Sequence, residues 1–125
     1  MILYPKIYLN NVKEITTELL KENNIKGLLL DVDNTLIDFN HKILEGAKEW
    51  CQDLKKQRIK LCILSNTNKI EKVKRVAKEL DLPYINFAKK PFKTGFKRAA
   101  NLLELDAKNI AVAGDQIMTD VLRRE

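Results

Sequence analysis

The sequence predicts an α/β protein in which helices cover both faces of a doubly wound parallel sheet. Short apolar runs typical of buried strands alternate with longer segments whose apolar residues recur at helical spacing. Strands that are separated by helices pair in parallel through right-handed crossovers. Polar residues follow the apolar runs directly, and ligands of such sheets bind at the carboxyl ends of the strands.

Each element of this fold has its own sequence pattern. Strands are expected at 25–31, 58–65, 82–88 and 109–115, where the apolar runs stand. The first helix is expected to follow a cap at Asn10 or Asn11 and to end near Glu22. Further helices are expected at 44–54, 70–80 and 96–103 from the spacing of their apolar residues.

Length and composition indicate one globular domain. A chain of 125 residues is sufficient for a single core, so one domain over residues 1–125 is expected. No apolar run approaches the roughly 20 residues of a membrane span, and Pro5 interrupts the N-terminal segment, so a cytoplasmic protein is expected. Cys51 and Cys62 lack metal-site spacing and are expected to be buried, reduced thiols.

The net charge of +6 fits an anionic partner, which leaves a phosphorylated substrate, a nucleic acid and an acidic membrane surface open. The basic residues are spread along the chain rather than concentrated in one run. Those of the 70–80 helix fit a solvated helix face, so no specific nucleic-acid binding is expected. The basic residues of this helix and of the position directly before it are Lys69, Lys72, Lys74, Arg75 and Lys78.

Asp31 and Asp33 directly follow the run of leucines and stand two residues apart, so in an extended chain they point the same way. Two like charges held close repel each other unless a cation neutralises them, and Mg²⁺ prefers oxygen ligands of this kind. Ser65, Lys90 and Asp115 also follow predicted strands. Because the carboxyl ends of parallel strands meet at one edge of the sheet, we expect these three residues at the same edge as Asp31 and Asp33. Such a cluster is suited to clamping a phosphate, with one carboxylate attacking phosphorus and the other transferring the proton.

The motifs resemble those of the haloacid dehalogenase superfamily of phosphatases. "DVDNT" (31–35) is similar to its first motif, "ILSN" (63–66) to its second, Lys90 of "KKP" to its third and "GDQIMTD" (114–120) to its fourth. "DVDNTL", "AKKPF" and "GDQIMTDV" resemble the YqeG family of class IIIA phosphatases, which is related to mitochondrial phosphatidylglycerophosphate phosphatase. The resemblance covers nearly the whole chain and implies a haloacid dehalogenase-like, Rossmann-type sheet.

The resemblance also implies a mechanism. Asp31 would be the nucleophile that becomes an aspartyl phosphate, and Asp33 would protonate the leaving oxygen and later activate water. Mg²⁺ would be held by Asp31, the backbone carbonyl of Asp33 and Asp115, with support from Asp120. The other implied site residues are Ser65 and Lys90 at the phosphoryl group, and Asn34, Thr35 and Asn66 as substrate-binding residues.

The motif spacing leaves room for one helix and one strand between successive motifs, so no inserted cap domain is expected. Capless members of the superfamily act on large or surface-bound substrates, and the positive charge is compatible with an anionic lipid at the membrane surface. Phosphatidylglycerophosphate is therefore the leading substrate hypothesis. A phosphosugar, a nucleotide or a phosphoprotein fits the same chemistry, because the motifs do not define the substrate pocket.

Two further expectations concern the end of the chain and rival functions. Relatives continue past the fourth motif with another strand, so the sheet is expected to lack its last edge strand and to leave the 109–115 strand partly unpaired, which would favour a homo-oligomer. A receiver-like signalling domain or a non-catalytic phosphate-binding and Mg²⁺-binding module is the alternative to an enzyme. Receivers place their acidic pair adjacent, whereas Asp31 and Asp33 are separated by one residue.

Overall fold

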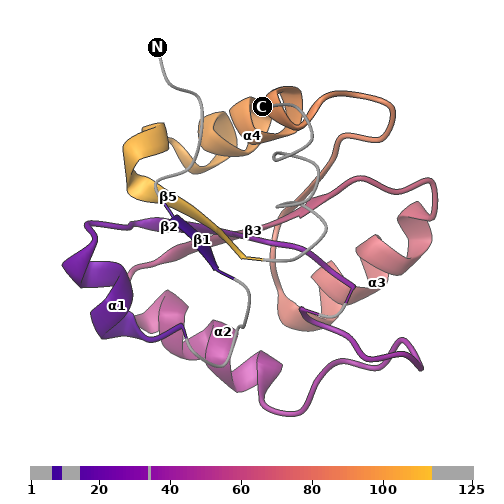
Figure 1. The fold of residues 1–125 in the computed structure, drawn as a ribbon. Coiled ribbons are helices and arrows are strands. Elements are labelled where there is room, and N and C mark those ends of the chain that lie inside the picture. The colour runs from indigo at the N-terminus through magenta and orange to yellow at the C-terminus, as the bar shows by residue number, and fades with distance from the viewer. Residues whose placement is uncertain (1–6, 10–14, 34, 114–125) are drawn as a thin grey trace.

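A computed structural model describes residues 7–9, 15–33 and 35–113 of the protein. One parallel sheet of five strands lies at its centre, in the order β1-β5-β2-β3-β4 (Figure 1). The strands are β1 (Ile7–Leu9), β2 (Gly27–Leu30), β3 (Lys60–Ser65), β4 (Tyr84–Asn86) and β5 (Ile110–Ala113). The predicted α/β class with a doubly wound parallel sheet is confirmed.

Helices cover both faces of the sheet. Those on one face are α1 (Thr17–Glu22), α2 (Ala47–Lys56) and α3 (Ile70–Leu80), and α4 (Phe92–Leu103) lies on the other (Figure 1). A short 3₁₀ turn, η2 (Ala107–Asn109), leads into β5. The chain therefore runs along one face of the sheet as far as β4 and then passes by way of α4 on the opposite face to β5, which lies between β1 and β2.

The alternation of side chains along β2 divides the core into two layers. Leu28 and Leu30 belong to the cluster beneath α1, α2 and α3, whereas Leu29 belongs to the cluster beneath α4. All three leucines are completely buried, as expected for a strand in the middle of a parallel sheet with both faces covered. The run of leucines thus fixes the strand that carries Asp31 at its end.

The α4 layer is built around aromatic side chains. Phe92 stacks on Phe96 with ring centroids 5.8 Å apart, and the rings of Phe92 and Phe87 form a T-shaped pair with centroids 6.1 Å apart. Gly95 allows this close packing, because a Cβ atom there would lie 2.5 Å from Cδ1 of Phe87. Phe87 directly follows β4, and its N–H donates to the carbonyl of Ser65 at 2.8 Å. The aromatic layer therefore supports the carboxyl end of β3.

The start of α1 differs from the expectation. The side-chain oxygen of Thr16 accepts a hydrogen bond from the N–H of Leu19 at 3.1 Å, which makes Thr16 the N-cap. The helix therefore begins at Thr17, and the expected caps, Asn10 and Asn11, lie outside the described residues.

The expectation of a partly unpaired β5 is wrong. β5 pairs with β2 on one side and with β1 on the other, in the register Ile7 to Ala111 and Leu9 to Ala113. The sequence pattern did not predict β1, whose three residues are too few to show a strand period. Because β1 covers this edge, the physical reason given for a homo-oligomer through β5 no longer applies.

The connection from β2 to α2 contains a short hairpin and no inserted domain, in agreement with the capless prediction. Oδ1 of Asp38 accepts hydrogen bonds from the N–H groups of Asn40 and Lys42 at 2.8 and 3.0 Å. Nη2 of Arg75 on α3 donates to the carbonyl of His41 at 2.7 Å. The hairpin is therefore fastened to α3, and Phe39 at its tip is 92% exposed.

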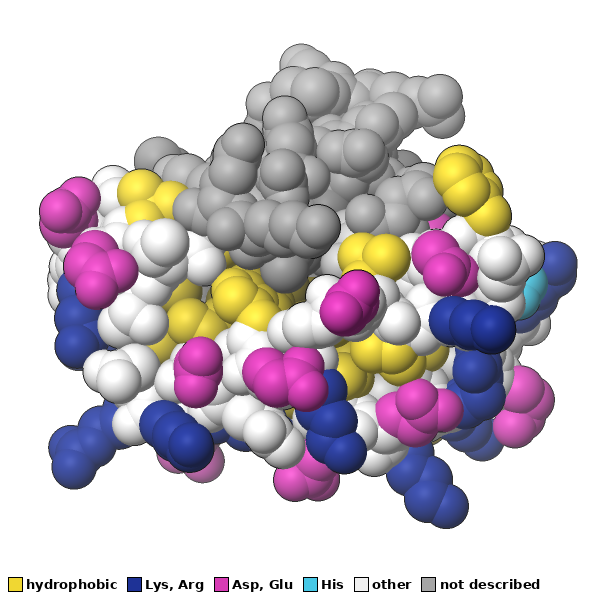
Figure 2. Space-filling view, turned by 90° about the horizontal axis from the view of Figure 1, so that it is seen from below, with side chains coloured by type: hydrophobic (Ala, Val, Ile, Leu, Met, Phe, Trp, Pro, Cys, Tyr) yellow, Lys and Arg dark blue, Asp and Glu magenta, His cyan; other side chains and the backbone are white. Residues whose placement is uncertain are grey.

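Acidic and basic side chains are interspersed over the face that carries α1, α2 and α3 (Figure 2). This arrangement fits the sequence-based expectation that the basic residues belong to a solvated helix face. Within the described part of the chain, none of the helices combines the length and the apolar character that a bilayer crossing requires.

Candidate active site

Asp31 lies immediately beyond β2, between the two strands that flank it. Its N–H donates to the carbonyl of Ala113 at 3.0 Å, which continues the pairing of β2 with β5 by one residue. Its carboxylate is buried, with 4% of the residue exposed, and Oδ1 accepts from the N–H of Val32 at 2.8 Å. Backbone pairing and burial thus hold a carboxylate at the carboxyl end of the central strand.

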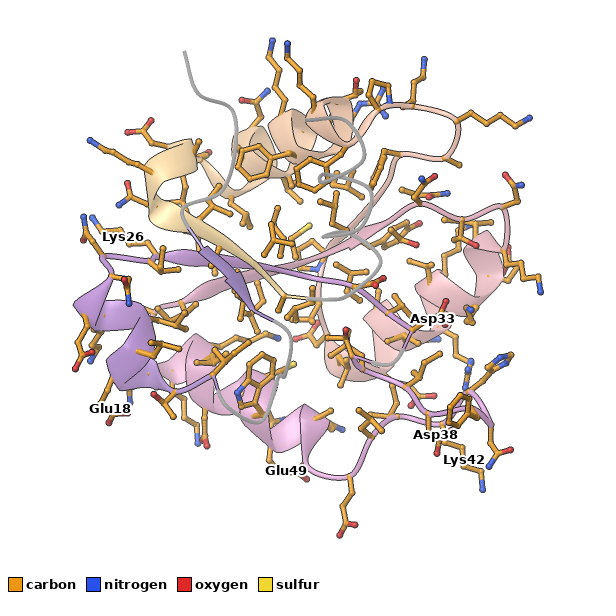
Figure 3. All side chains as sticks on the ribbon, viewed as in Figure 1. Glu18, Lys26, Asp33, Asp38, Lys42 and Glu49 are labelled. Carbon is orange, nitrogen blue, oxygen red and sulfur yellow. The ribbon has the colours of Figure 1, made fainter. Side chains whose placement is uncertain are left out.

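A tight turn follows and places Asp33 beside Asp31. The carbonyl of Val32 accepts hydrogen bonds from the N–H groups of Thr35, Leu36 and Ile37, at 3.4, 2.9 and 3.2 Å. The turn buries Thr35 and leaves the Asp33 side chain 37% exposed, near the start of α3 (Figure 3). The buried carboxylate is therefore suited to a fixed role and the partly exposed one to contact with water or a leaving group.

The loop after β3 supplies the second side of the site. Ser65 is buried at the strand end. The Asn86 side chain holds the following residues, since Oδ1 accepts from the N–H of Thr67 at 3.1 Å and Nδ2 donates to the Thr67 carbonyl at 2.9 Å. Oγ1 of Thr67 in turn accepts from the N–H of Lys69 at 3.0 Å. These hydrogen bonds hold the turn that directly follows Ser65.

These two loops enclose one cavity of about 280 Å³. Four of the predicted site residues line it, namely Asp31, Asp33, Ser65 and Asn66. The remaining lining residues are Val32, Thr67, Lys69 and Lys72. Carboxylates, a hydroxyl and an amide from two segments that are distant in sequence therefore lie around one cavity, as expected for residues that follow parallel strands.

Lys72 is a site residue that the sequence reasoning missed. Its ammonium nitrogen lies 2.8 Å from Oδ1 of Asp33, and its side chain is only 16% exposed. The helical pattern assigned Lys72 to a solvated face together with its basic neighbours. The first turn of α3 instead directs this one lysine toward the loop after β2.

The other predicted site residues have different positions. Lys90 is exposed in the turn after β4, where its N–H donates to the carbonyl of Phe87 at 2.9 Å, and it does not line the cavity. Thr35 is buried beneath the loop after β2 and also does not line it. Asn34, Asp115 and Asp120 lie outside the described residues.

The donor set of the cavity fits a hard divalent cation. Asp31 and Asp33 present carboxylate oxygens to one space, and oxygen ligands are what Mg²⁺ prefers. Among the residues that the structure describes, no group of three or more His, Cys, Asp or Glu side chains forms a complete metal cluster. Further ligands would have to come from water, substrate or residues such as Asp115 and Asp120.

The two thiols do not contribute to this chemistry. Burial raises the pKa of Cys51 to about 11, although nearby Lys55 acts in the opposite direction, and burial raises the pKa of Cys62 to about 12. Both thiols are therefore protonated at neutral pH, and a protonated thiol is a poor nucleophile and metal ligand. The predicted buried state of both cysteines is confirmed.

Comparison with known proteins identifies the family. The model of the haloacid dehalogenase-like hydrolases matches residues 40–122, more than half of the chain. Probable phosphatase YqeG of Bacillus subtilis (strain 168) is 39% identical over 119 residues, which are 94% of this chain and 69% of the relative. The chain belongs to the haloacid dehalogenase-like hydrolases. The sequence-based assignment to this family, and to an enzyme of the hydrolase class, is thereby confirmed.

Solved structures of two phosphatases share the fold. The cobalt-bound deoxy-D-mannose-octulosonate 8-phosphate phosphatase (YrbI) of Haemophilus influenzae has a TM-score of 0.62 at 21% identity, covering 76% of this chain and 61% of its own. The 3-deoxy-D-manno-octulosonate 8-phosphate phosphatase of Moraxella catarrhalis, in complex with magnesium, phosphate and KDO, has a TM-score of 0.53 at 22% identity, covering 81% and 64%. The chain thus spans less than two thirds of either solved structure.

Proposed function

We propose that the protein is a phosphoric monoester hydrolase that works through an aspartyl-phosphate intermediate on Asp31. The observation that carries the proposal is the shared cavity of a buried carboxylate, a second carboxylate and a serine at adjacent strand ends. The similarity to probable phosphatase YqeG supports the same reaction. Residues 1–125 would then form one phosphatase core domain that acts in the cytoplasm.

The proposed reaction consists of two successive displacements at phosphorus. Asp31 attacks phosphorus while the bond to the leaving oxygen breaks, and Asp33 gives that oxygen its proton. Asp33 then takes a proton from water, whose oxygen attacks the phosphorus of the aspartyl phosphate and releases inorganic phosphate. Burial suits Asp31 to the first role because its position is fixed, and exposure suits Asp33 to proton exchange with water and leaving group.

The remaining residues position the phosphoryl group. The Ser65 hydroxyl donates to a phosphoryl oxygen, and the amides near Asn34 and Asn66 are further donors. Lys90 offsets phosphoryl charge if its side chain extends toward the cavity, and Thr35 orients the loop from beneath. Mg²⁺ would be held by Asp31, the carbonyl of Asp33, Asp115 and Asp120, and when bound it supplies positive charge against the carboxylates and the phosphate.

Metal dependence tests the proposal directly. Hydrolysis of an aryl phosphate is expected with Mg²⁺ and is expected to fall to background with excess chelator, because the two carboxylates then repel the phosphate. Readdition of Mg²⁺ is expected to restore the rate, with circular dichroism as the control for folding. Mg²⁺ binding without turnover would instead favour the alternative of a non-catalytic or receiver-like binding module.

An anionic lipid is the substrate class that the surface favours, with phosphatidylglycerophosphate as the leading example. Phe39 is almost completely exposed on the hairpin after β2, and the basic residues Lys42 and Arg75 lie on or against that hairpin. An exposed aromatic side chain with nearby cations suits contact with an anionic membrane surface. The protein would then act peripherally at the membrane.

Vesicles separate this substrate from soluble ones. Phosphate release from phosphatidylglycerophosphate in anionic vesicles is expected to exceed release from soluble monoesters at equal ester concentration, because the membrane concentrates the enzyme. Replacement of Phe39 by serine is expected to reduce only the vesicle rate. Equal or slower turnover of the lipid by the parent protein would contradict a lipid substrate. It would favour a phosphosugar, a nucleotide or a phosphoprotein instead.

A further inference from the structure

The cavity beside Asp31 has a basic side that the proposed reaction does not use. Lys69 and Lys72, from the start of α3, line the same space as the two carboxylates. The Lys72 side chain is only 16% exposed, and its ammonium nitrogen lies 2.8 Å from Oδ1 of Asp33. Lys69 stays exposed at the rim, where its backbone N–H is bound to Oγ1 of Thr67.

Stability alone is a weak reason for this arrangement. An ion pair with a partly exposed carboxylate contributes little to folding, and confining a long lysine side chain costs rotamer entropy. The described contacts of the Lys72 ammonium use one of its three N–H donors, the one directed at Asp33. The other two donors are therefore suited to a group that enters the cavity.

The proposed role of Asp33 indicates where such a group would lie. In the proposed reaction Asp33 protonates the leaving oxygen, so the organic part of the ester lies against Asp33 and consequently beside Lys72. We infer that Lys72, assisted by Lys69, binds a second negatively charged group on the leaving side of the substrate. The preferred substrates are then phosphate monoesters that carry a phosphodiester or a carboxylate a few bonds from the ester oxygen, an inference that rests on the proposed phosphatase function.

Two other cations of α3 have different contacts. Lys74 lies 3.8 Å from Oε1 of Glu71 with about half of its side chain exposed, and Arg75 is bound to the hairpin carbonyl of His41. Lys74 therefore offers a matched control, since it has the same charge on the same helix and does not line the cavity beside Asp31.

The experiment compares three synthetic phosphate monoesters on one three-carbon backbone, whose far end is a hydroxyl, a carboxylate or a methyl phosphodiester. The parent protein is expected to favour the two anionic esters by at least about tenfold in kcat/KM, the factor typical of a charge-assisted hydrogen bond. The preference is expected to arise in KM. Lys72→Met is expected to abolish it, Lys72→Arg to retain part of it, and Lys74→Met to leave it unchanged.

Other outcomes overturn the inference. Equal kcat/KM for the three esters in the parent protein would remove the second-anion subsite. A loss in Lys72→Met that is the same for all three esters would show that Lys72 only positions Asp33. Calorimetric titration of Asp31→Asn with the same esters tests binding without turnover, so a retained anion preference there would separate this subsite from any failure of the proposed reaction.

Discussion

Replacement of Asp31 by asparagine is expected to reduce phosphate-ester hydrolysis by a factor on the order of 10⁴ to 10⁶, the effect of removing a covalent nucleophile. An amide does not attack phosphorus at a useful rate, and the residual rate would come from binding alone. The loss corresponds to about 5–8 kcal/mol of transition-state stabilisation. The measurement is steady-state hydrolysis of an aryl phosphate in Mg²⁺, with acid-quenched protein analysed for covalently bound phosphate.

The fold is expected to survive this substitution. Asparagine has the shape of aspartate, and its amide oxygen is able to accept the N–H of Val32 as Oδ1 of Asp31 does. The thermal midpoint is therefore expected to stay close to that of the parent, since the shape of the side chain and this hydrogen bond are both kept. Asp53→Asn is the matched control, because Asp53 is exposed on α2 and does not line the cavity beside Asp31. Covalent phosphate on the Asp31→Asn variant would contradict the assignment of the nucleophile.

The positions of Asp31, Asp33 and Ser65 were predictable because they depend on two strong signals. The leucine run and the "KLCILS" run are long enough to define buried strands, and residues after parallel strands meet at one edge. No side-chain detail is needed for that conclusion. It follows from the topology alone, and the shared cavity bears it out.

The role of Lys72 was not predictable in the same way. Its helical position alone fits a solvated face, and its contact with Asp33 depends on how the turn held by the Val32 carbonyl approaches the start of α3. β1 was missed for a similar reason, because its pairing with β5 joins segments near opposite ends of the chain and leaves no local pattern. Both features depend on contacts between segments that are distant in sequence, which the hydrophobic pattern of a single segment does not show.

Truncation of Phe96 to alanine is expected to destabilise the protein by about 3–5 kcal/mol, a large share of the total for a domain of this size. Phe96 is 1% exposed and stacks on Phe92 in the layer between α4 and the sheet, so its removal leaves a cavity that the rigid β-strands cannot close. Urea denaturation of parent and variant measures the change. Alanine is a strong helix former, so the expected cost comes from packing rather than from the helix itself.

Leu102→Ala is the control for this substitution, since Leu102 is on the same helix with about half of its surface exposed. It is expected to change the free energy of unfolding by less than about 0.5 kcal/mol. The effect of Phe96→Ala should also reach the active site, because the same aromatic layer holds Phe87, whose N–H supports the carbonyl of Ser65. Activity is therefore expected to be lost at a lower temperature in Phe96→Ala than in Leu102→Ala. Equal stability of the two variants would show that the aromatic layer does not hold α4 and the end of β3 in place.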